Sequence, residues 1–133
     1  MSKKVLIMCT GNSCRSIIAE ALINHYLSNI DAYSCGILAS GEVNPNAKRI
    51  LQENKIWLNS YYSKNINDII DIEFDLIITV CDHAEKNCPV FPKDIPKVHI
   101  GFDDPARLEY IFFEKTYRDI RDILLPKVQE ILS

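Results

Sequence analysis

Residues 5–20, VLIMCTGNSCRSIIAE, decide the fold of this chain. The apolar start predicts a buried strand, the small and polar residues 9–16 predict a tight loop, and a helix is expected from Ile17 onward. In such a loop the backbone N–H groups and the positive end of the helix both point inward, which favours anions. The stretch therefore predicts an oxyanion site at a strand-to-helix turn.

The same loop carries a thiol, a guanidinium and a hydroxyl group. Cys9 ends the strand, Arg15 follows after five intervening residues, and Ser16 comes next. The surrounding positive groups favour a thiolate, so Cys9 is the predicted nucleophile, with Ser16 donating a hydrogen bond to its sulfur. The guanidinium can hold two oxygens of a tetrahedral anion. Gly11 is expected to let the backbone turn where a Cβ would obstruct it. The predicted oxyanion-binding residues are Thr10, Gly11, Asn12, Ser13, Cys14, Arg15 and Ser16.

An ordinary strand-to-helix turn with an incidental cysteine is the alternative. It does not account for Cys, Gly, Arg and Ser together at these spacings, which form a specific set. A single glycine pattern would carry much less weight. The functional interpretation of the loop is therefore preferred.

Length and charge restrict the classes of protein. The 133 residues, 47% of them hydrophobic, predict one domain over residues 1–133 with one core. A net charge of -3 without a block of Lys and Arg makes nucleic acid an unexpected partner. No apolar run reaches membrane-spanning length, and residues 1–4 lead straight into a strand without a signal-peptide core. The chain is expected to be a cytoplasmic monomer that does not bind a membrane.

The five cysteines predict chemistry rather than a scaffold. In a cytosolic chain they favour catalytic, redox or metal-binding roles, and an odd number excludes complete pairing within one chain. Six residues separate Cys81 from Cys88 and no Cys-x2-Cys pair occurs, so no metal site is expected. His83 and His99 could suggest metal or general-base chemistry, but isolated histidines are more often structural.

The remaining pattern alternates helices with strands. Strands are expected at residues 31–36, 75–81 and 97–100, and a loop at 82–96. Helices are expected at 17–27, from Asn44-Pro45 to about residue 54, less clearly near 65, and over 108–132 with an interruption at Pro126. The predicted fold class is α/β, a single-domain four-stranded parallel sheet flanked by helices on both faces.

Ligands of such sheets bind at the carboxyl ends of the strands. Three segments with reactive groups follow predicted strands: the Cys9 loop, the Cys81 loop and the turn at Asp104. They are therefore expected to meet on one rim of the sheet.

Cys9 followed by Arg15-Ser16, with Asp104-Pro105 after a late strand, resembles the low-molecular-weight protein tyrosine phosphatase family. That resemblance implies a nucleophilic role for Cys9, oxyanion binding by Arg15, and a general acid at Asp104. Asp103 is the alternative acid by position, but the residue directly before proline matches the family pattern.

Residues 80–89, VCDHAEKNCP, are similar to the redox segment of the thioredoxin-coupled arsenate reductases, which share the phosphatase fold. Residues 9–16, CTGNSCRS, and 101–106, GFDDPA, match the same group. The resemblance implies reduction of arsenate to arsenite. Cys9 would attack arsenate, Cys81 would attack the sulfur of the Cys9 adduct, and Cys88 would then attack Cys81.

Thioredoxin would act as electron donor by reducing the final disulfide, with no tightly bound cofactor. Movement of the disulfide to Cys88 predicts a conformational change in residues 82–92. The group gives no chemical step to Cys14, and Cys35 is interpreted as a small core residue. Two alternatives stay open. One is a phosphatase acting on phosphotyrosine or small phosphomonoesters, and the other is a redox sensor without turnover. The two additional thiols, together with a complete nucleophile, anion clamp and acid, favour the reductase.

One position departs from the resemblance. Some members of the reductase group bind potassium near the anion loop through residues that correspond here to Asn12, Glu20, Ser34 and a carboxylate at the position of Lys64. The hypothesis is that the Lys64 ammonium takes the place of that cation and steadies the loop.

Overall fold

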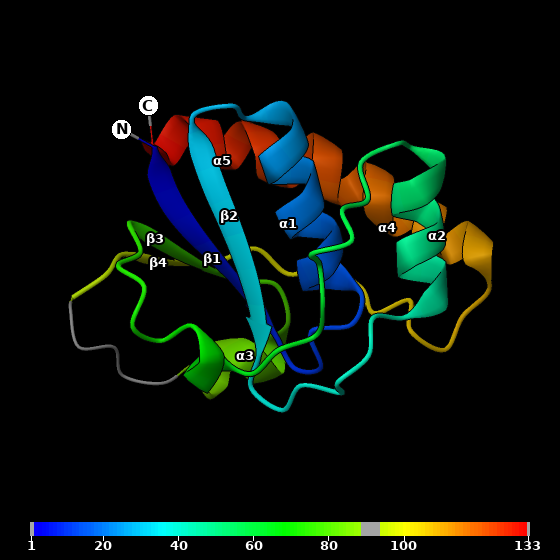
Figure 1. Cartoon of the computed structure of the whole chain (residues 1–133), viewed down its shortest axis with the longest axis horizontal. Coiled ribbons are helices and arrows are strands. Elements are labelled where there is room, and N and C mark those ends of the chain that lie inside the picture. Colours follow the sequence, from blue (N-terminus) through cyan, green and yellow to red (C-terminus); the bar gives the residue numbers. More distant parts are fainter. Residues whose placement is uncertain (1, 89–93, 133) are drawn as a thin grey trace.

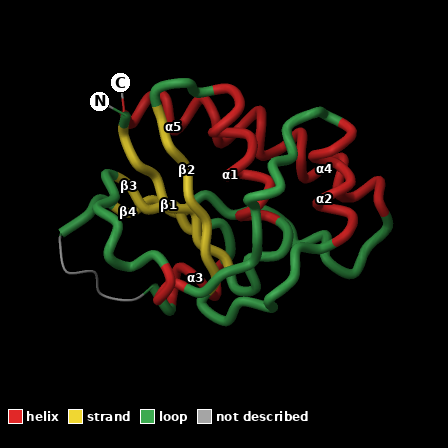
Figure 2. The backbone as a smooth tube through the Cα atoms, viewed as in Figure 1, coloured by secondary structure: helices red, strands yellow, loops and turns green. Residues whose placement is uncertain are grey.

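Four parallel strands form one sheet in the order β2-β1-β3-β4. The computed structural model describes residues 2–88 and 94–132. Figure 1 and Figure 2 show the strands running side by side, with the longer helices gathered to one side of them. The strands are β1 (Lys3–Cys9), β2 (Ile30–Gly36), β3 (Leu76–Thr79) and β4 (Lys97–His99). The predicted four-stranded parallel α/β fold is confirmed.

Strand β1 occupies the interior of the sheet because its side chains are apolar on both faces. Val5 pairs with Ala32 of β2 on one side and with Leu76 of β3 on the other. The side chains of residues 5–8 are fully buried. Continuous apolar strands are typical of a parallel sheet that is covered on both faces. The chain leaves this central strand at Cys9, so the predicted anion loop starts at the middle of the rim.

Helix α1 (Arg15–Tyr26) packs on β1 and β2, directly after the loop. Helix α2 (Pro45–Glu53) begins as predicted, because the Asn44 side chain accepts a hydrogen bond of 2.9 Å from the N–H of Asn46. A 3₁₀ turn at Ile66–Asp68 has a capping box with Asn65, close to the expected short helix.

The C-terminal helical region is continuous, and a π-helical turn precedes Pro126, where an interruption was expected. Helix α4 (Tyr110–Asp119) passes through a π-helical turn, Ile120–Leu124, into α5 (Leu125–Leu132). Pro126 has no N–H group, and its ring would clash with the carbonyl four residues earlier in a regular helix. The wider turn just before Pro126 relieves that conflict, so the helical path continues along α1 instead of breaking.

The loop prediction for residues 82–96 is wrong at its start, where α3 (Asp82–Lys86) forms. The Cys81 sulfur accepts the N–H of Ala84 at 3.4 Å and caps this helix, an unusual capping group that turn propensities do not anticipate. Helix α3 packs against β1 and β3 near the carboxyl ends of the strands. The rearrangement predicted for residues 82–92 includes residues outside the described ranges and stays a prediction.

Within residues 2–88 and 94–132, every helix is too short or too polar to cross a lipid bilayer.

Candidate active site

The Cys9 sulfur lies buried at the carboxyl end of β1, surrounded by hydrogen-bond donors. The N–H of Asn12 donates to Sγ at 3.2 Å, and the Ser16 hydroxyl lies 2.8 Å from it. Asn12 Nδ2 donates to Ser16 Oγ at 2.8 Å, which leaves the serine hydrogen available for the sulfur. Both groups can donate to a thiolate, which is the nucleophilic form of cysteine.

Asn12 holds the loop in shape. Its φ of 49° is left-handed, a conformation that asparagine tolerates better than most residues. The side chain is fully buried, and its Oδ1 accepts the backbone N–H of Lys64 at 2.8 Å. The backbone of Lys64 therefore holds Asn12 in place, and Asn12 in turn holds Ser16.

The expectation for Gly11 is wrong, and the steric constraint falls on Gly36. A Cβ at Gly11 would have Ser13 Oγ as its nearest neighbour, at 3.6 Å, which is ordinary contact. A Cβ at Gly36 would lie 2.5 Å from the carbonyl oxygen of Thr10 and 3.1 Å from the N–H nitrogen of Asn12. The end of β2 can approach the anion loop only because this position has no side chain. In the sequence, this steric constraint shows only as a glycine at the end of the second strand, which lies beside the loop.

Arg15 connects the loop to the turn at residues 101–106. Its Nη1 donates to the carbonyl oxygen of Phe102 at 2.9 Å, and Nη2 lies 3.6 Å from Asp104 Oδ2. Asp104 Oδ1 accepts the N–H of Ala106 at 3.0 Å, which fixes the carboxylate. The guanidinium is largely buried whereas the carboxylate is half-exposed. The structure thus places Asp104 beside the anion loop, and its role as general acid stays a prediction.

Cys81 lies at the same rim, at the end of the strand next to β1. Its Sγ is 3.3 Å from the Thr10 hydroxyl, so it contacts the residue that follows Cys9. Cys88 is half-buried beyond the far end of α3, and both cysteines are reduced in this structure. Helix α3 separates the two thiols along the chain, whereas a disulfide needs Cα atoms about 4.4–6.8 Å apart. We therefore expect a bond between Cys81 and Cys88 to require a change in α3, and this stays a prediction.

Cys14 and Cys35 are expected to be unreactive thiols. Burial raises the pKa of Cys14 to about 11 and that of Cys35 to about 12, so both stay protonated near neutral pH. This agrees with the packing roles expected for them. Burial also raises the pKa of Cys88, with Lys97 acting in the opposite direction.

Lys64 lies where the cation hypothesis needs a positive charge. Its side chain is 6% exposed, with Nζ 3.9 Å from Glu20 Oε1 and donating to the carbonyl oxygen of Tyr62 at 3.0 Å. Glu20 Oε1 also accepts the Ser34 hydroxyl at 2.6 Å. Burial raises the pKa of Glu20 to about 7, while Lys64 and Ser34 lower it. Replacement of a metal cation by this ammonium stays a prediction.

His83 is a site residue that sequence reasoning missed. Its Nδ1 lies 3.1 Å from the Thr10 hydroxyl, the same group that contacts Cys81. The only signal in the sequence was its place two residues after Cys81. The interpretation of His83 as an isolated structural histidine therefore needs correction.

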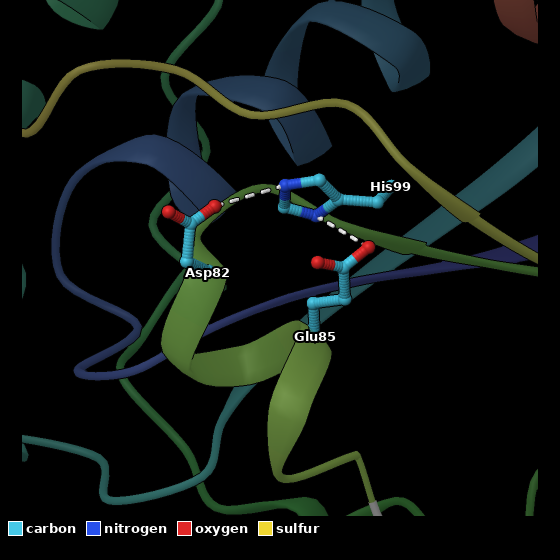
Figure 3. Close-up of side chains that lie close together, drawn as sticks. All are labelled: Asp82, Glu85 and His99. Carbon is cyan, nitrogen blue, oxygen red and sulfur yellow. Dashed lines mark ion pairs between the residues drawn. The ribbon is translucent and has the colours of Figure 1, made fainter.

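His99 lies between two carboxylates on the side of α3 shown in Figure 3, and we call these three residues the His99 clamp. Its Nε2 is 3.2 Å from Asp82 Oδ1, and its Nδ1 is 3.8 Å from Glu85 Oε2 and 2.8 Å from the Thr79 hydroxyl. Asp82 and Glu85 are both exposed and each faces the imidazole. We interpret the clamp as a set of polar contacts between α3 and the end of β4.

Known proteins resemble the chain over nearly its whole length. The family model for low molecular weight phosphotyrosine protein phosphatase matches residues 4–129. An arsenate reductase of Bacillus cereus (strain AH187) is 44% identical over 119 residues, which cover 89% of this chain and 88% of the relative.

Two solved structures have the same architecture. An arsenate reductase from Archaeoglobus fulgidus has a TM-score of 0.81 and 29% identity, covering 94% of this chain and 98% of its own. A thioredoxin-dependent arsenate reductase from Corynebacterium glutamicum has a TM-score of 0.71 and 27% identity, covering 96% of this chain and 62% of its own. With the anion loop, its arginine and the adjacent aspartate in place, the chain belongs to the low molecular weight phosphotyrosine protein phosphatase family and is an enzyme of that family.

Proposed function

We propose that the protein reduces arsenate to arsenite through a relay of three thiols. The observation that carries this proposal is the contact between the Cys81 sulfur and Thr10, at 3.3 Å, which places a second thiol against the oxyanion loop. Hydrolysis of a phosphocysteine needs water and has no use for that thiol. The similarity to proteins named arsenate reductase, at 44% identity, supports the same substrate.

The first step uses the loop as it stands. Arsenate binds with its oxygens on the loop N–H groups and on Arg15, and the Cys9 thiolate attacks arsenic. A proton from the Asp104 carboxyl group, which lies 3.6 Å from Arg15 at the edge of the loop, allows one hydroxyl group of the bound arsenate to leave as water. The product is an arsenic(V) adduct on the Cys9 sulfur.

The second and third steps move electrons between sulfurs. The Cys81 thiolate attacks Cys9 Sγ, the sulfur–arsenic bond breaks, and its electron pair reduces arsenic(V) to arsenic(III), which leaves as arsenite. The Cys88 thiolate then attacks Cys81 and releases the Cys9 thiolate. The remaining Cys81–Cys88 disulfide requires an unwound α3, which presents it on the surface to an external dithiol.

Thioredoxin is the electron donor that we propose for the last disulfide. The name of the Corynebacterium glutamicum structure, a thioredoxin-dependent arsenate reductase, supports this choice. A surface disulfide that forms across a segment unwound from a helix is of the strained, accessible kind that such dithiol proteins reduce.

Trapping the first disulfide tests the relay. In Cys88→Ala, one equivalent of arsenate is expected to yield a Cys9–Cys81 disulfide and one equivalent of arsenite, both measured by mass spectrometry. In Cys81→Ala, no disulfide and no arsenite are expected. A Cys81→Ala variant that still releases arsenite would contradict the proposed order of thiols. Rapid hydrolysis of an aryl phosphate by the native chain, without arsenate reduction, would instead assign a phosphatase.

A further inference from the structure

A chain of polar atoms connects Cys81 to the imidazole of His83. The Cys81 sulfur lies 3.3 Å from Thr10 Oγ1, and Thr10 Oγ1 lies 3.1 Å from His83 Nδ1. A threonine hydroxyl has one hydrogen to donate and two lone pairs to accept with. Thr10 can therefore accept the S–H of Cys81 and donate its own O–H to a neutral His83 at the same time.

We propose that His83 is a positioning residue for the second step, which takes the proton of the Cys81 thiol through the Thr10 hydroxyl. The proposal rests on the proposed function in one respect only, because that function supplies the target of the thiolate, which is the Cys9 adduct. The S–H proton passes to Thr10 Oγ1 as the Thr10 hydroxyl proton passes to His83 Nδ1. The products are a Cys81 thiolate, an unchanged threonine and an imidazolium, and no electron is transferred.

The surroundings of Cys81 make such an acceptor useful. Cys81 is buried, so its proton reaches an acceptor only through neighbouring groups. After the transfer, the Thr10 hydroxyl and the N–H of Ala84, at 3.4 Å, both donate to the sulfur. His83 is exposed, and its imidazolium, with Nδ1 3.1 Å from Thr10 Oγ1, keeps a positive charge near the thiolate. A cysteine with a nearby imidazole is a common arrangement for activating a thiol nucleophile.

The sulfurs of Cys9 and Cys81 thus have different hydrogen-bond partners. Cys9 receives hydrogen bonds from Asn12 N–H and Ser16, which stabilise negative charge on its sulfur without an imidazole. Cys81 reaches its imidazole through a single hydroxyl. This separation allows Cys81 to lose its proton independently of the ionisation of Cys9.

The ionisable groups on the elements around His83 do not replace it as the acceptor. They come from α3, from the end of β1, from the start of α1 and from the end of β4, and they are Asp82, Glu85, Lys86, Cys9, Arg15 and His99. The two carboxylates of α3 face His99, as Figure 3 shows, and Arg15 faces the turn at residues 101–106. His83 Nδ1 is the nitrogen that meets the Thr10 hydroxyl.

The test is the rate at which iodoacetamide modifies Cys81, measured without arsenate. A Cys9→Ser/Cys88→Ser background leaves Cys81 as the reactive thiol, because burial raises the pKa of Cys14 to about 11 and that of Cys35 to about 12. Mass spectrometry follows modification of Cys81 from about pH 6 to about pH 9, the range in which imidazoles and thiols titrate. The variants are His83→Gln, whose amide oxygen can still accept from Thr10 but cannot hold the proton, and His25→Gln at an exposed histidine of α1 as matched control.

His83→Gln is expected to slow modification about tenfold near neutral pH and to approach the background rate near pH 9, where hydroxide removes the thiol proton directly. His25→Gln is expected to leave the profile unchanged. A profile that His83→Gln leaves unchanged overturns the proposal, and so does a uniform slowing at every pH, which indicates only a structural role. Because no arsenate is present, the result does not depend on the proposed function. A native chain that fails to reduce arsenate overturns that function and leaves the proton transfer standing.

Discussion

Replacing Lys64 by methionine tests whether the buried ammonium supports the carboxylate of Glu20. The side chains of both residues are almost completely buried, and their charged atoms lie 3.9 Å apart. Methionine keeps most of the apolar stem and removes the charge. Burial has already raised the pKa of Glu20 from 4.5 to about 7, so in the native protein the carboxyl group ionises between pH 6 and pH 8. Without Lys64 this pKa rises further, and the group stays protonated at pH 8.

The sign and the size of the effect follow from that shift. A carboxyl group with a raised pKa in the folded state makes the protein less stable as pH rises from the unfolded value of 4.5 toward the folded value of about 7. In the native protein this decline ends near the folded pKa, whereas in Lys64→Met it continues to higher pH. One pH unit beyond a pKa corresponds to about 1.4 kcal/mol. The variant should therefore lose roughly 1 kcal/mol more, relative to the native protein, at pH 8 than at pH 6.

Urea unfolding at both pH values measures this difference, with Lys127→Met on the exposed side of α5 as matched control. The control is expected to show no pH-dependent loss. An equal loss at pH 6 and pH 8 in Lys64→Met would refute the reasoning. The same preparations test the cation hypothesis, because exchanging potassium for sodium should leave native turnover unchanged. Strong dependence on potassium would contradict it.

Three further outcomes are expected. Gly36→Ala should lower stability by about 1–3 kcal/mol in urea unfolding and reduce arsenate turnover, because its Cβ would meet the Thr10 carbonyl at 2.5 Å; Gly11→Ala, which has room for a Cβ, should be closer to native stability. Asp104→Asn should slow the first step about 10²–10⁴-fold in single-turnover measurements, since an amide cannot supply the proton; an unchanged rate would exclude it as the acid. Cys35→Ala should keep full turnover while lowering stability by about 1 kcal/mol, because it removes a fully buried but unreactive thiol.

The sequence predicted the features that depend on local pattern. Continuous apolar runs indicate the strands β1 and β3, and Asn44-Pro45 marks the start of α2 because capping and proline act within one turn. The loop of Cys9 was predictable for the same reason. Its thiol, arginine and serine lie within eight consecutive residues, and the strand before them orients the loop.

The features that were missed depend on contacts between distant segments. Gly36 matters because the end of β2 meets the loop after β1, a contact that no local pattern contains. His83 joins the site because α3 is capped by Cys81 and turns the ring toward Thr10. Lys64 pairs with Glu20 because the fold buries both side chains next to each other. A resemblance suggested the position of that pair, but only the structure gives the distance between the two charges.

The most direct test of the three-thiol relay is arsenate-dependent consumption of NADPH with thioredoxin and thioredoxin reductase, in the native chain and in Cys88→Ala. The relay predicts steady turnover in the native chain and at most one turnover in the variant. Without Cys88 the disulfide stays between Cys9 and Cys81, the residue that caps α3. Equal steady turnover in both proteins, or none in the native chain, would contradict it.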